Sequence, residues 1–305
     1  MRAPSAARLG LLLLPLVACG GSTGAVAGPG GDGPLAVSAA FYPYEFLAQR
    51  VGGPDVQVTG LTSPGTEPHD LELTPRQVGA LGESDLVVYA AGFQPAVDDA
   101  VEQQAPDRAF DANAVAPLQP GYVPLEDGEP EPEQEGADPH VWLDPVRYAG
   151  IADALAERLG EQRPDSAAAF TARAVALRTE LTALDAELAA GLADCARREI
   201  VTSHNAFGYL ADRYDLEQVA VTGLTPEAEP TPGRLAEVQA LAEARGVTTI
   251  FFEELVSPRT AESLARDVGA EAVVLSPLEG PPESGDYLSE MRRTLQVLRT
   301  ALDCR

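Results

Sequence analysis

The sequence predicts an α/β fold of two lobes, each a parallel-type sheet covered by helices, with a long rigid helix joining them. Short β-rich runs alternate with longer helical runs over residues 35–112, and the same alternation returns over residues 198–302. This βαβα rhythm is typical of parallel sheets, in which each crossover is a helix. Between the two halves, residues 145–192 consist almost entirely of helix-forming residues.

The first half has the pattern of four strands and three helices. Runs rich in β-branched and aromatic residues predict strands at 35–41, 56–61, 85–90 and 108–112. The segments between them predict helices at 44–53, 74–84 and 93–104. The first of these helices ends at a pair of glycines, a common stop signal. We assign these elements to an N-terminal lobe, residues 35–144.

The middle region predicts a strut between the lobes. Within residues 164–192 the apolar side chains recur three and four residues apart, which places them on one helical face. They are Phe170, Ala174, Leu177, Leu181, Leu184 and Leu188. A helix of about 26 residues extends about 39 Å, more than the width of a small domain. We therefore expect a connecting helical region over residues 145–193.

The second half repeats the alternation. Strands are predicted at 198–203, 216–221, 247–253 and 272–276. Helices are predicted at 204–214, 231–246, 257–269 and 284–302. The second of these helices has Pro near its start and Gly at its end, as helices commonly do. These elements form a C-terminal lobe, residues 194–305.

The N-terminus has the pattern of an export signal. Arg2 and Arg8 precede an apolar run, Leu9–Val17, that is far shorter than the roughly 20 residues a membrane span needs. The next residues resemble a bacterial lipobox, in which the cysteine is acylated. We predict a signal peptide at 1–18 and a lipidated flexible tether at 19–34, anchored through Cys19. An ordinary signal peptide with a chance cysteine is the alternative.

Export also bears on the other cysteines. Apart from Cys19, the chain has Cys195 and Cys304. In an oxidising compartment an even number of cysteines predicts a disulfide. A zinc thiolate site is the alternative, but the sequence lacks the C-x-x-C spacing typical of such sites.

The chain is strongly acidic, with a formal net charge of -26 and no lysine. Such a surface repels nucleic acid and raises the local concentration of cations. Seven carboxylates fall within residues 126–138, in an acidic loop over 115–139 that has no apolar anchor. This loop is either an inert insertion or a weak cation collector. Arginine supplies every positively charged side chain apart from histidine, and Ala, Gly and Pro are abundant. This composition is typical of a GC-rich bacterial genome.

The three histidines are the candidate metal ligands. His204 directly follows a predicted strand, His69 lies in the loop after another, and His140 follows the acidic loop. Ligands of such folds bind beside the carboxyl ends of the strands, so we expect the three to meet in the cleft between the lobes. Imidazole nitrogens suit Zn²⁺, whereas Mn²⁺ prefers carboxylate oxygens. Asp70 and Asp138 are placed to orient the rings as hydrogen-bond acceptors.

An enzyme is the competing class of function. A zinc ion with three histidines and an open position can activate water, and Ser203 lies beside His204. Adjacent residues in a turn rarely face each other, however. The sequence also lacks the G-x-S-x-G and H-E-x-x-H patterns of hydrolases. We predict that the protein is not an enzyme.

Six segments, in this order, resemble the metal-binding lipoproteins of ATP-driven importers, the cluster A-I solute-binding proteins of the zinc (ZnuA-like) and manganese types. They are EPHDLELTP, DPHVWLDP, TSHNAFGYLADRYDL, GLTPEAEPTPGRLAEV, IFFEELVSPRTAESLA and DYLSEMRRTLQVL. The resemblance covers nearly all of residues 35–303. It implies two βα lobes joined by a rigid helix, a bound divalent transition metal, small lobe movement and delivery of the metal to an ABC permease. A membrane-anchored monomer at the cell surface or facing the periplasm is expected.

The resemblance carries the family's metal ligands to His69, His140 and His204, and manganese members have Glu in place of the third. The chain departs from the family at Ser276, where Asp is usual and Ser is a poor zinc ligand. Glu279, three residues on, or a water is therefore expected as the fourth ligand. The loop before the second ligand is rich in glutamate, whereas zinc members often have a histidine-rich loop there.

Glu253 and Glu254 follow the strand predicted at 247–253. They are expected either to hydrogen-bond within the site or to form a structural ion pair. The sequence thus predicts capture of Zn²⁺. The alternatives are a manganese-binding homologue, and a metal-binding adhesin or zinc buffer that works without a permease.

Overall fold

The computed structural model describes residues 33–115, 117–120 and 137–305, and Gly33–Arg305 form one compact unit. The predicted signal peptide, the lipidation site Cys19, most of the tether and most of the acidic loop lie outside the described residues. Within the part of the chain that is described, no helix is both long and apolar enough to cross a membrane.

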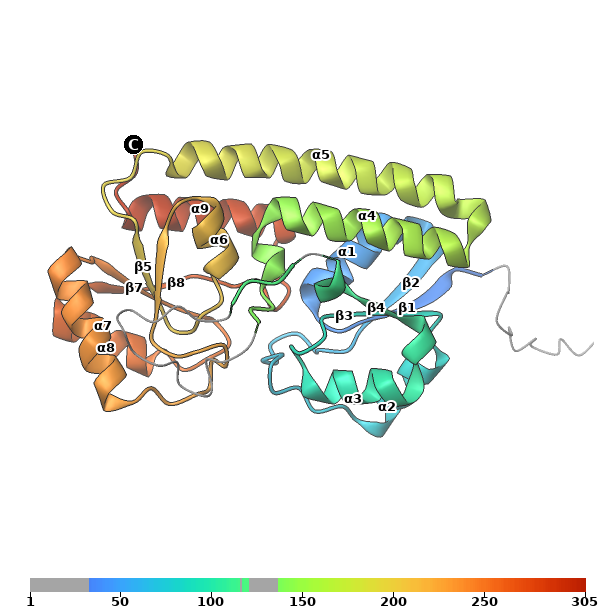
Figure 1. Cartoon of the computed structure of the whole chain (residues 1–305), viewed down its shortest axis with the longest axis horizontal. Helices are drawn as coiled ribbons and strands as arrows, with labels where there is room; N and C mark the ends of the chain where they lie inside the picture. Colours follow the sequence, from blue (N-terminus) through green and yellow to red (C-terminus); the bar gives the residue numbers. More distant parts are fainter. Residues whose placement is uncertain (1–32, 116, 121–136) are drawn as a thin grey trace, which may run out of the picture. The chain divides into compact units, whose positions relative to one another are not determined.

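The first lobe contains a four-stranded parallel sheet in the order β2-β1-β3-β4. Its strands are β1 (Leu35–Ala39), β2 (Val56–Gly60), β3 (Leu86–Tyr89) and β4 (Ala109–Asp111). Its helices are α1 (Tyr42–Gly52), α2 (Pro75–Glu83) and α3 (Pro95–Gln104). Figure 1 shows α1 on one face of the sheet and α2 and α3 on the other. Every strand and helix predicted for this half is present.

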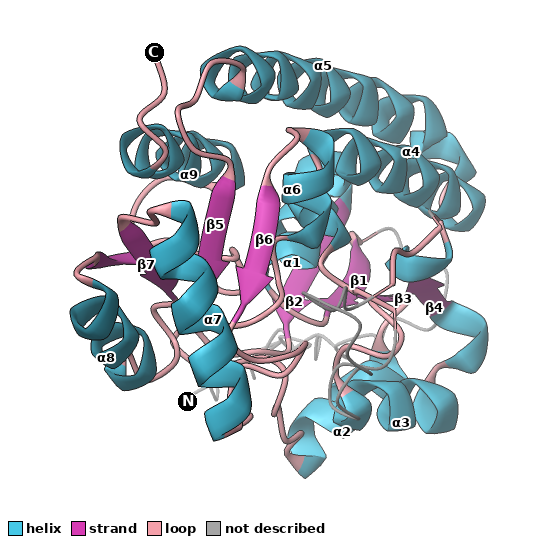
Figure 2. Ribbon diagram, turned by 60° about the vertical axis from the view of Figure 1, so that its left-hand side comes forward, coloured by secondary structure: helices cyan, strands magenta, loops and turns pink. Residues whose placement is uncertain are grey.

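The second lobe repeats this arrangement in the order β6-β5-β7-β8, again with parallel strands. Its strands are β5 (Glu199–Thr202), β6 (Glu217–Ala220), β7 (Thr249–Phe252) and β8 (Glu271–Val274). Its helices are α6 (Gly208–Arg213), α7 (Pro232–Arg245), α8 (Arg259–Val268) and α9 (Tyr287–Ala301). Figure 2 shows α7 and α8 on the side of the sheet away from α9. The predicted fold class is confirmed.

One helix begins later than its sequence predicts. The helix expected from position 204 starts at Gly208 instead. The backbone before it continues outward from β5 and bonds to the loop after β6, since Thr222 N donates to Ser203 O and Asn205 N donates to Gly223 O, each at 2.9 Å. His204 therefore lies in a loop at the carboxyl end of β5.

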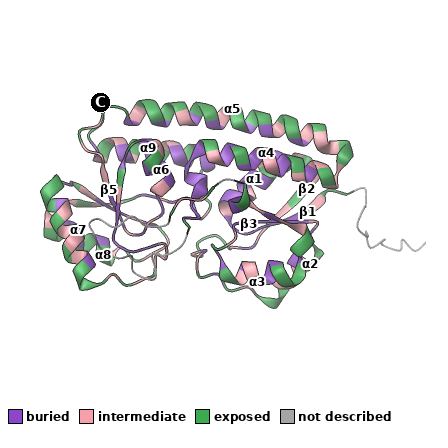
Figure 3. Cartoon of the chain, viewed as in Figure 1, coloured by how far each residue is buried: buried purple, intermediate pink, exposed green. Residues whose placement is uncertain are grey.

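Two long helices connect the lobes. They are α4 (Pro145–Gln162) and α5 (Ala167–Leu192), which has the 26 residues expected of the strut. The six apolar side chains predicted to share one face of α5 are all buried, while its outer face is exposed (Figure 3). This face packs along α4 and against α1 and α9, so α5 contacts helices of both lobes (Figure 1).

The larger of two buried cores runs through both lobes. It includes the first sheet, the inner faces of α4 and α5, and the apolar sides of α6 and α9. A second, smaller core lies between the second sheet and the helices α7 and α8. Because the larger core is continuous and closely packed cores deform little, it favours small movements of one lobe against the other.

Cys195 and Cys304 form a disulfide, as predicted. It joins the chain just after α5 to the chain just after α9. The two cysteines are 109 residues apart, and in the chain-entropy model a loop of that size is worth up to about 4.7 kcal/mol. This disulfide therefore restricts the unfolded chain more strongly than a disulfide that closes a short loop would.

The double variant Cys195→Ala, Cys304→Ala is expected to lose about 2–4 kcal/mol of unfolding free energy, because its unfolded chain is less restricted. Guanidinium titrations followed by circular dichroism measure the loss. Chemically reduced wild-type protein is the control and should unfold at the same midpoint as the variant. Equal midpoints for the oxidised parent and the variant would show that the bond contributes nothing.

Candidate metal centre

His69 lies in the long loop between β2 and α2. Gln94, which is buried at the start of α3, holds this loop through two donated hydrogen bonds, to Pro68 O at 3.0 Å and Thr62 Oγ1 at 3.1 Å. The His69 ring packs edge-on against Phe93, with 4.3 Å between ring centroids. The adjacent anchor at Pro68 and the aromatic contact together fix the direction of the imidazole.

His140 lies in the segment that leads into α4, and its side chain is fully buried. Its Nδ1 lies 2.8 Å from Asp138 Oδ1, which also accepts the His140 backbone N–H at 2.9 Å. Asp138 is thus a ring-orienting acceptor, as predicted for it. With Nδ1 carrying the proton, the lone pair of Nε2 is free to bind a metal.

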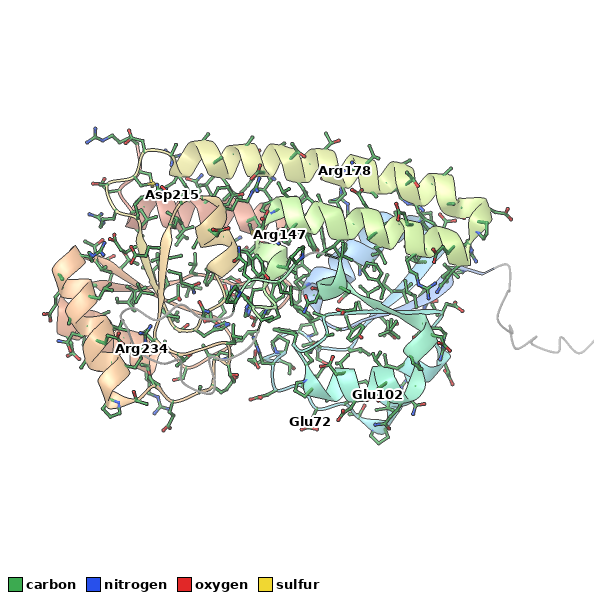
Figure 4. The ribbon with its side chains drawn as sticks, viewed as in Figure 1. Glu72, Glu102, Arg147, Arg178, Asp215 and Arg234 are labelled. Carbon is green, nitrogen blue, oxygen red and sulfur yellow. A yellow bond between two sulfur atoms is a disulfide. The ribbon has the colours of Figure 1, made fainter. Side chains whose placement is uncertain are left out.

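The second lobe holds the His140 segment in place through α6. Tyr209 Oη donates to Asp138 O at 2.7 Å, and the Arg147 guanidinium lies 5.0 Å from the centre of the Tyr209 ring (Arg147 is labelled in Figure 4). A Cβ at Gly208 would lie 2.7 Å from Asp138 Oδ2, so only glycine allows this approach. These contacts could not be predicted from the sequence, because they join residues about 70 apart in the chain.

His204 is also fully buried, and its ring is held by Glu253 at the end of β7. Glu253 Oε1 lies 2.5 Å from His204 Nδ1 and accepts the Ser203 hydroxyl at 2.5 Å. Glu253 is therefore the member of the predicted pair that supports a ligand, whereas Glu254 is exposed. The Ser203 hydroxyl donates its hydrogen bond to this carboxylate, so it is not paired with His204 as an activated nucleophile would be.

The fourth side chain is Glu279, in the loop between β8 and α9. Ser276 occupies the position where an aspartate was expected, and its Oγ accepts the Leu278 N–H at 3.2 Å. Leu278 adopts a left-handed conformation, with φ of 61°. The Ser276 hydroxyl thus forms part of a tight turn, and the buried Glu279 carboxylate lies among the histidines.

The four side chains have the spacing of a tetrahedral metal shell. Glu279 Oε1 lies 3.3, 3.4 and 3.8 Å from the Nε2 atoms of His69, His140 and His204, and the last two Nε2 atoms are 3.3 Å apart. Donors 2.0–2.1 Å from a tetrahedral zinc ion lie about 3.3 Å from one another. The donors come from both lobes, so an ion at their centre would bridge the lobes.

The chain's relationships accord with this site. The model of the zinc-uptake complex component A periplasmic (ZnuA) family matches residues 37–301. The chain belongs to this family. The family's description names a component of zinc uptake.

Two proteins named for zinc binding or zinc uptake are similar to this chain over most of its length. The chain is 34% identical over 307 residues to the zinc-binding lipoprotein AdcA of Streptococcus pneumoniae serotype 4, which covers 96% of this chain and 60% of AdcA. The chain thus spans about three fifths of that relative's length. It is 32% identical over 306 residues to the high-affinity zinc uptake system protein ZnuA of Bacillus subtilis, covering 95% of this chain and 94% of that protein.

A solved structure of similar fold is the laminin-binding protein Lmb of Streptococcus agalactiae, described as bifunctional with adhesin and metal transporting activity. The TM-score is 0.78 at 30% sequence identity, and the match covers 88% of this chain and 99% of Lmb. The two-lobe fold of this ZnuA-family chain is therefore shared with a relative of solved structure.

The electrostatics of the ZnuA-family site stabilise the ionised carboxylate and the protonated imidazole together. Burial disfavours the charged form of His140, but hydrogen bonds with Asp138 and Glu279 outweigh this and raise the pKa of His140 to about 9. Burial likewise disfavours the Glu279 carboxylate, yet the three surrounding histidines hold the pKa of Glu279 well below its usual range. A bound cation would replace the ring protons as the positive charge that stabilises the ionised Glu279 carboxylate.

Asp70 lies apart from the predicted ring-orienting position. It is exposed, and among the described residues His69 Nε2 lies 3.3 Å from Glu279 Oε1, while no hydrogen bond joins the His69 ring to Asp70. The Asp70 carboxylate instead lies within 4.8 Å of those of Glu67 and Glu227. Burial raises the pKa of Glu67 to about 7; the neighbouring His69 opposes this rise, and the carboxylates of Glu279 and Glu227 add to it. The sequence cannot distinguish the two arrangements, because a loop residue next to a ligand can face either way.

Proposed function

We propose that this chain is an extracytoplasmic solute-binding lipoprotein that captures Zn²⁺ and delivers it to an ABC permease. The observation that carries the proposal is the convergence of three imidazole Nε2 atoms and one carboxylate oxygen at tetrahedral spacing. Three nitrogens and one oxygen suit Zn²⁺, whereas Mn²⁺ is better served by a shell of more oxygens. AdcA and ZnuA, with which the chain shares about a third of its residues, are named for zinc.

Capture would begin at His69 and end with the buried donors. The His69 side chain is 9% exposed, while the side chains of His140 and His204 are fully buried. The buried pair is already oriented by Asp138 and Glu253, so little ordering is needed when the ion arrives. His69 is the donor that an incoming ion meets first.

Delivery requires a membrane location and a partner. The lipobox at Cys19 supports lipid anchorage, and the family's place in zinc uptake supports a permease as the receiving partner. We propose that the protein acts as a monomer on the outer side of the membrane. The continuous core through both lobes supports release by small local changes at the ligand loops.

Adhesion is a second candidate function, because the fold matches Lmb, which is described as an adhesin as well as a metal transporter. The tetrahedral site favours metal capture as the primary role. Binding of the chain to immobilised laminin, with and without zinc, would test adhesion separately. Saturable laminin binding by the chain would support the second role, and its absence would remove it.

The proposed function is tested by competitive titration of the full chain, stripped of metal, against a chromogenic zinc chelator. We expect one tight zinc site per chain, and manganese binding weaker by about two orders of magnitude or more because the donors are mostly nitrogen. Weak binding at several sites would mean that the acidic surface only collects cations. Manganese binding as tight as zinc binding would favour the manganese-type homologue.

A further inference from the structure

Trp142, the chain's only tryptophan, touches the ligand loops of both lobes. It is fully buried and lies two residues after His140, with 5.1 Å between the two ring centroids. Its indole Nε1–H donates to Pro277 O at 2.7 Å, and Pro277 lies two residues before Glu279. One side chain therefore connects a nitrogen ligand of the first lobe with the carboxylate of the second.

The loop that accepts this hydrogen bond is under strain. Leu278, between Pro277 and Glu279, is buried and has a φ of 61°, a conformation in which an L side chain is disfavoured. Such strain costs about 1–3 kcal/mol and persists only where surrounding contacts fix it. The turn made by Ser276 is one such contact, and the indole of Trp142 supplies another from the other lobe.

Contacts with neighbouring residues fix the position of Trp142. Its backbone carbonyl accepts the Tyr287 hydroxyl at 2.6 Å, from the first residue of α9. Its ring makes edge contacts with Phe41 at 4.9 Å and Phe93 at 5.5 Å between centroids. Phe93 in turn packs on His69, so the aromatic cluster reaches two of the three histidines.

We propose that Trp142 is a positioning residue that holds Glu279 at tetrahedral spacing from the histidines, through the indole hydrogen bond to Pro277. This inference rests on the proposed function and identifies a residue outside the predicted ligand set. Loss of the hydrogen bond lets the strained turn relax, which moves the Glu279 carboxylate away from the histidine Nε2 atoms. The metal then loses a well-placed fourth donor.

The variant Trp142→Phe keeps an aromatic ring and removes the N–H. Zinc affinity of the full chain is expected to fall about tenfold, the usual scale when a residue that orients a ligand is changed. Tyr148→Phe is the matched control, because it also removes a buried donor to a proline carbonyl, that of Pro43. We expect the control to lose thermal stability and to keep the zinc affinity of the parent.

A double-mutant cycle with Glu279→Ala separates positioning from general stability. If Trp142 acts through Glu279, then Trp142→Phe should weaken zinc binding less than about twofold once Glu279 is absent, because coupled residues are not additive. A tenfold effect in both backgrounds would overturn the proposal and would point to displacement of His140 instead. Unchanged affinity of Trp142→Phe in the parent background would overturn it as well.

Because the chain has a single tryptophan, growth with a benzothienyl analogue of tryptophan replaces this side chain alone. The analogue keeps the ring's shape and lacks the N–H, so it serves where Trp142→Phe fails to fold. The same tenfold loss supports the hydrogen bond, and parental affinity overturns it. If the unmodified protein itself binds no zinc, the proposed function fails, whereas failure of the variants alone removes only the role of Trp142.

Discussion

Zinc affinity is expected to fall by about 100-fold or more in His204→Ala. The side chain is fully buried, and its Nε2 lies 3.3 Å from that of His140 and 3.8 Å from Glu279 Oε1. Four-ligand zinc sites are worth about 10–16 kcal/mol, so one ligand contributes about 3 kcal/mol, or somewhat more than 100-fold. The variant also leaves the Glu253 carboxylate buried without its imidazole partner, which costs further stability.

His140→Ala and His69→Ala are expected to weaken binding in the same way, with the smallest loss for His69, the most accessible of the three. Glu254→Gln is the matched control, because it neutralises an exposed carboxylate next to the one that orients His204. The control should bind zinc like the parent in the competitive titration. Any histidine variant that retains the parental affinity removes that residue from the site. Equal losses in the control and the variants would mean that surface charge dominates binding.

Features fixed by periodicity could be predicted from the sequence. The apolar residues of α5 recur every three or four positions, and since only one helical face can meet the core, their burial follows. The disulfide follows from parity, because two cysteines remain to pair when Cys19 is assigned to the expected lipid anchor. His204 and His69 could be placed after predicted strands, because parallel strands bring their carboxyl ends to one edge.

Features set by loop conformation could not be predicted. Glu279 was expected only as an alternative to a water, since its placement depends on the left-handed turn at Leu278, and leucine gives no sign of such a turn. The choice between Glu253 and Glu254 depends on where β7 stops, because alternation reverses the direction of each side chain. The start of α6 was placed too early, because hydrogen bonds to the neighbouring loop hold the backbone of Ser203 and Asn205 outside the helix.

Zinc affinity is expected to fall by about 100-fold or more between pH 7 and pH 5, because zinc binds only the neutral imidazole and displaces its proton. In the metal-free protein the pKa of His140 is raised to about 9, so the ring carries a proton throughout this range. For each proton that zinc displaces, the zinc affinity falls tenfold for every unit by which the pH falls. The pKa of Glu279 is held low, so its carboxylate is already ionised and releases no proton in this window.

Calorimetric titration at pH 7 in two buffers of different ionisation enthalpy measures the protons released, and at least one per zinc is expected. Asp138→Asn is the informative variant, since it removes a carboxylate that raises the pKa of His140. Fewer protons should then be released, and affinity should depend less steeply on pH, even though the ring is less well oriented.

Two outcomes would contradict this account. In the parent, release of less than one proton per zinc, with an affinity that does not change from pH 8 to pH 6, would show that His140 is neutral before zinc arrives or does not bind it. A parental proton count in Asp138→Asn would instead trace the release to another ligand of the site.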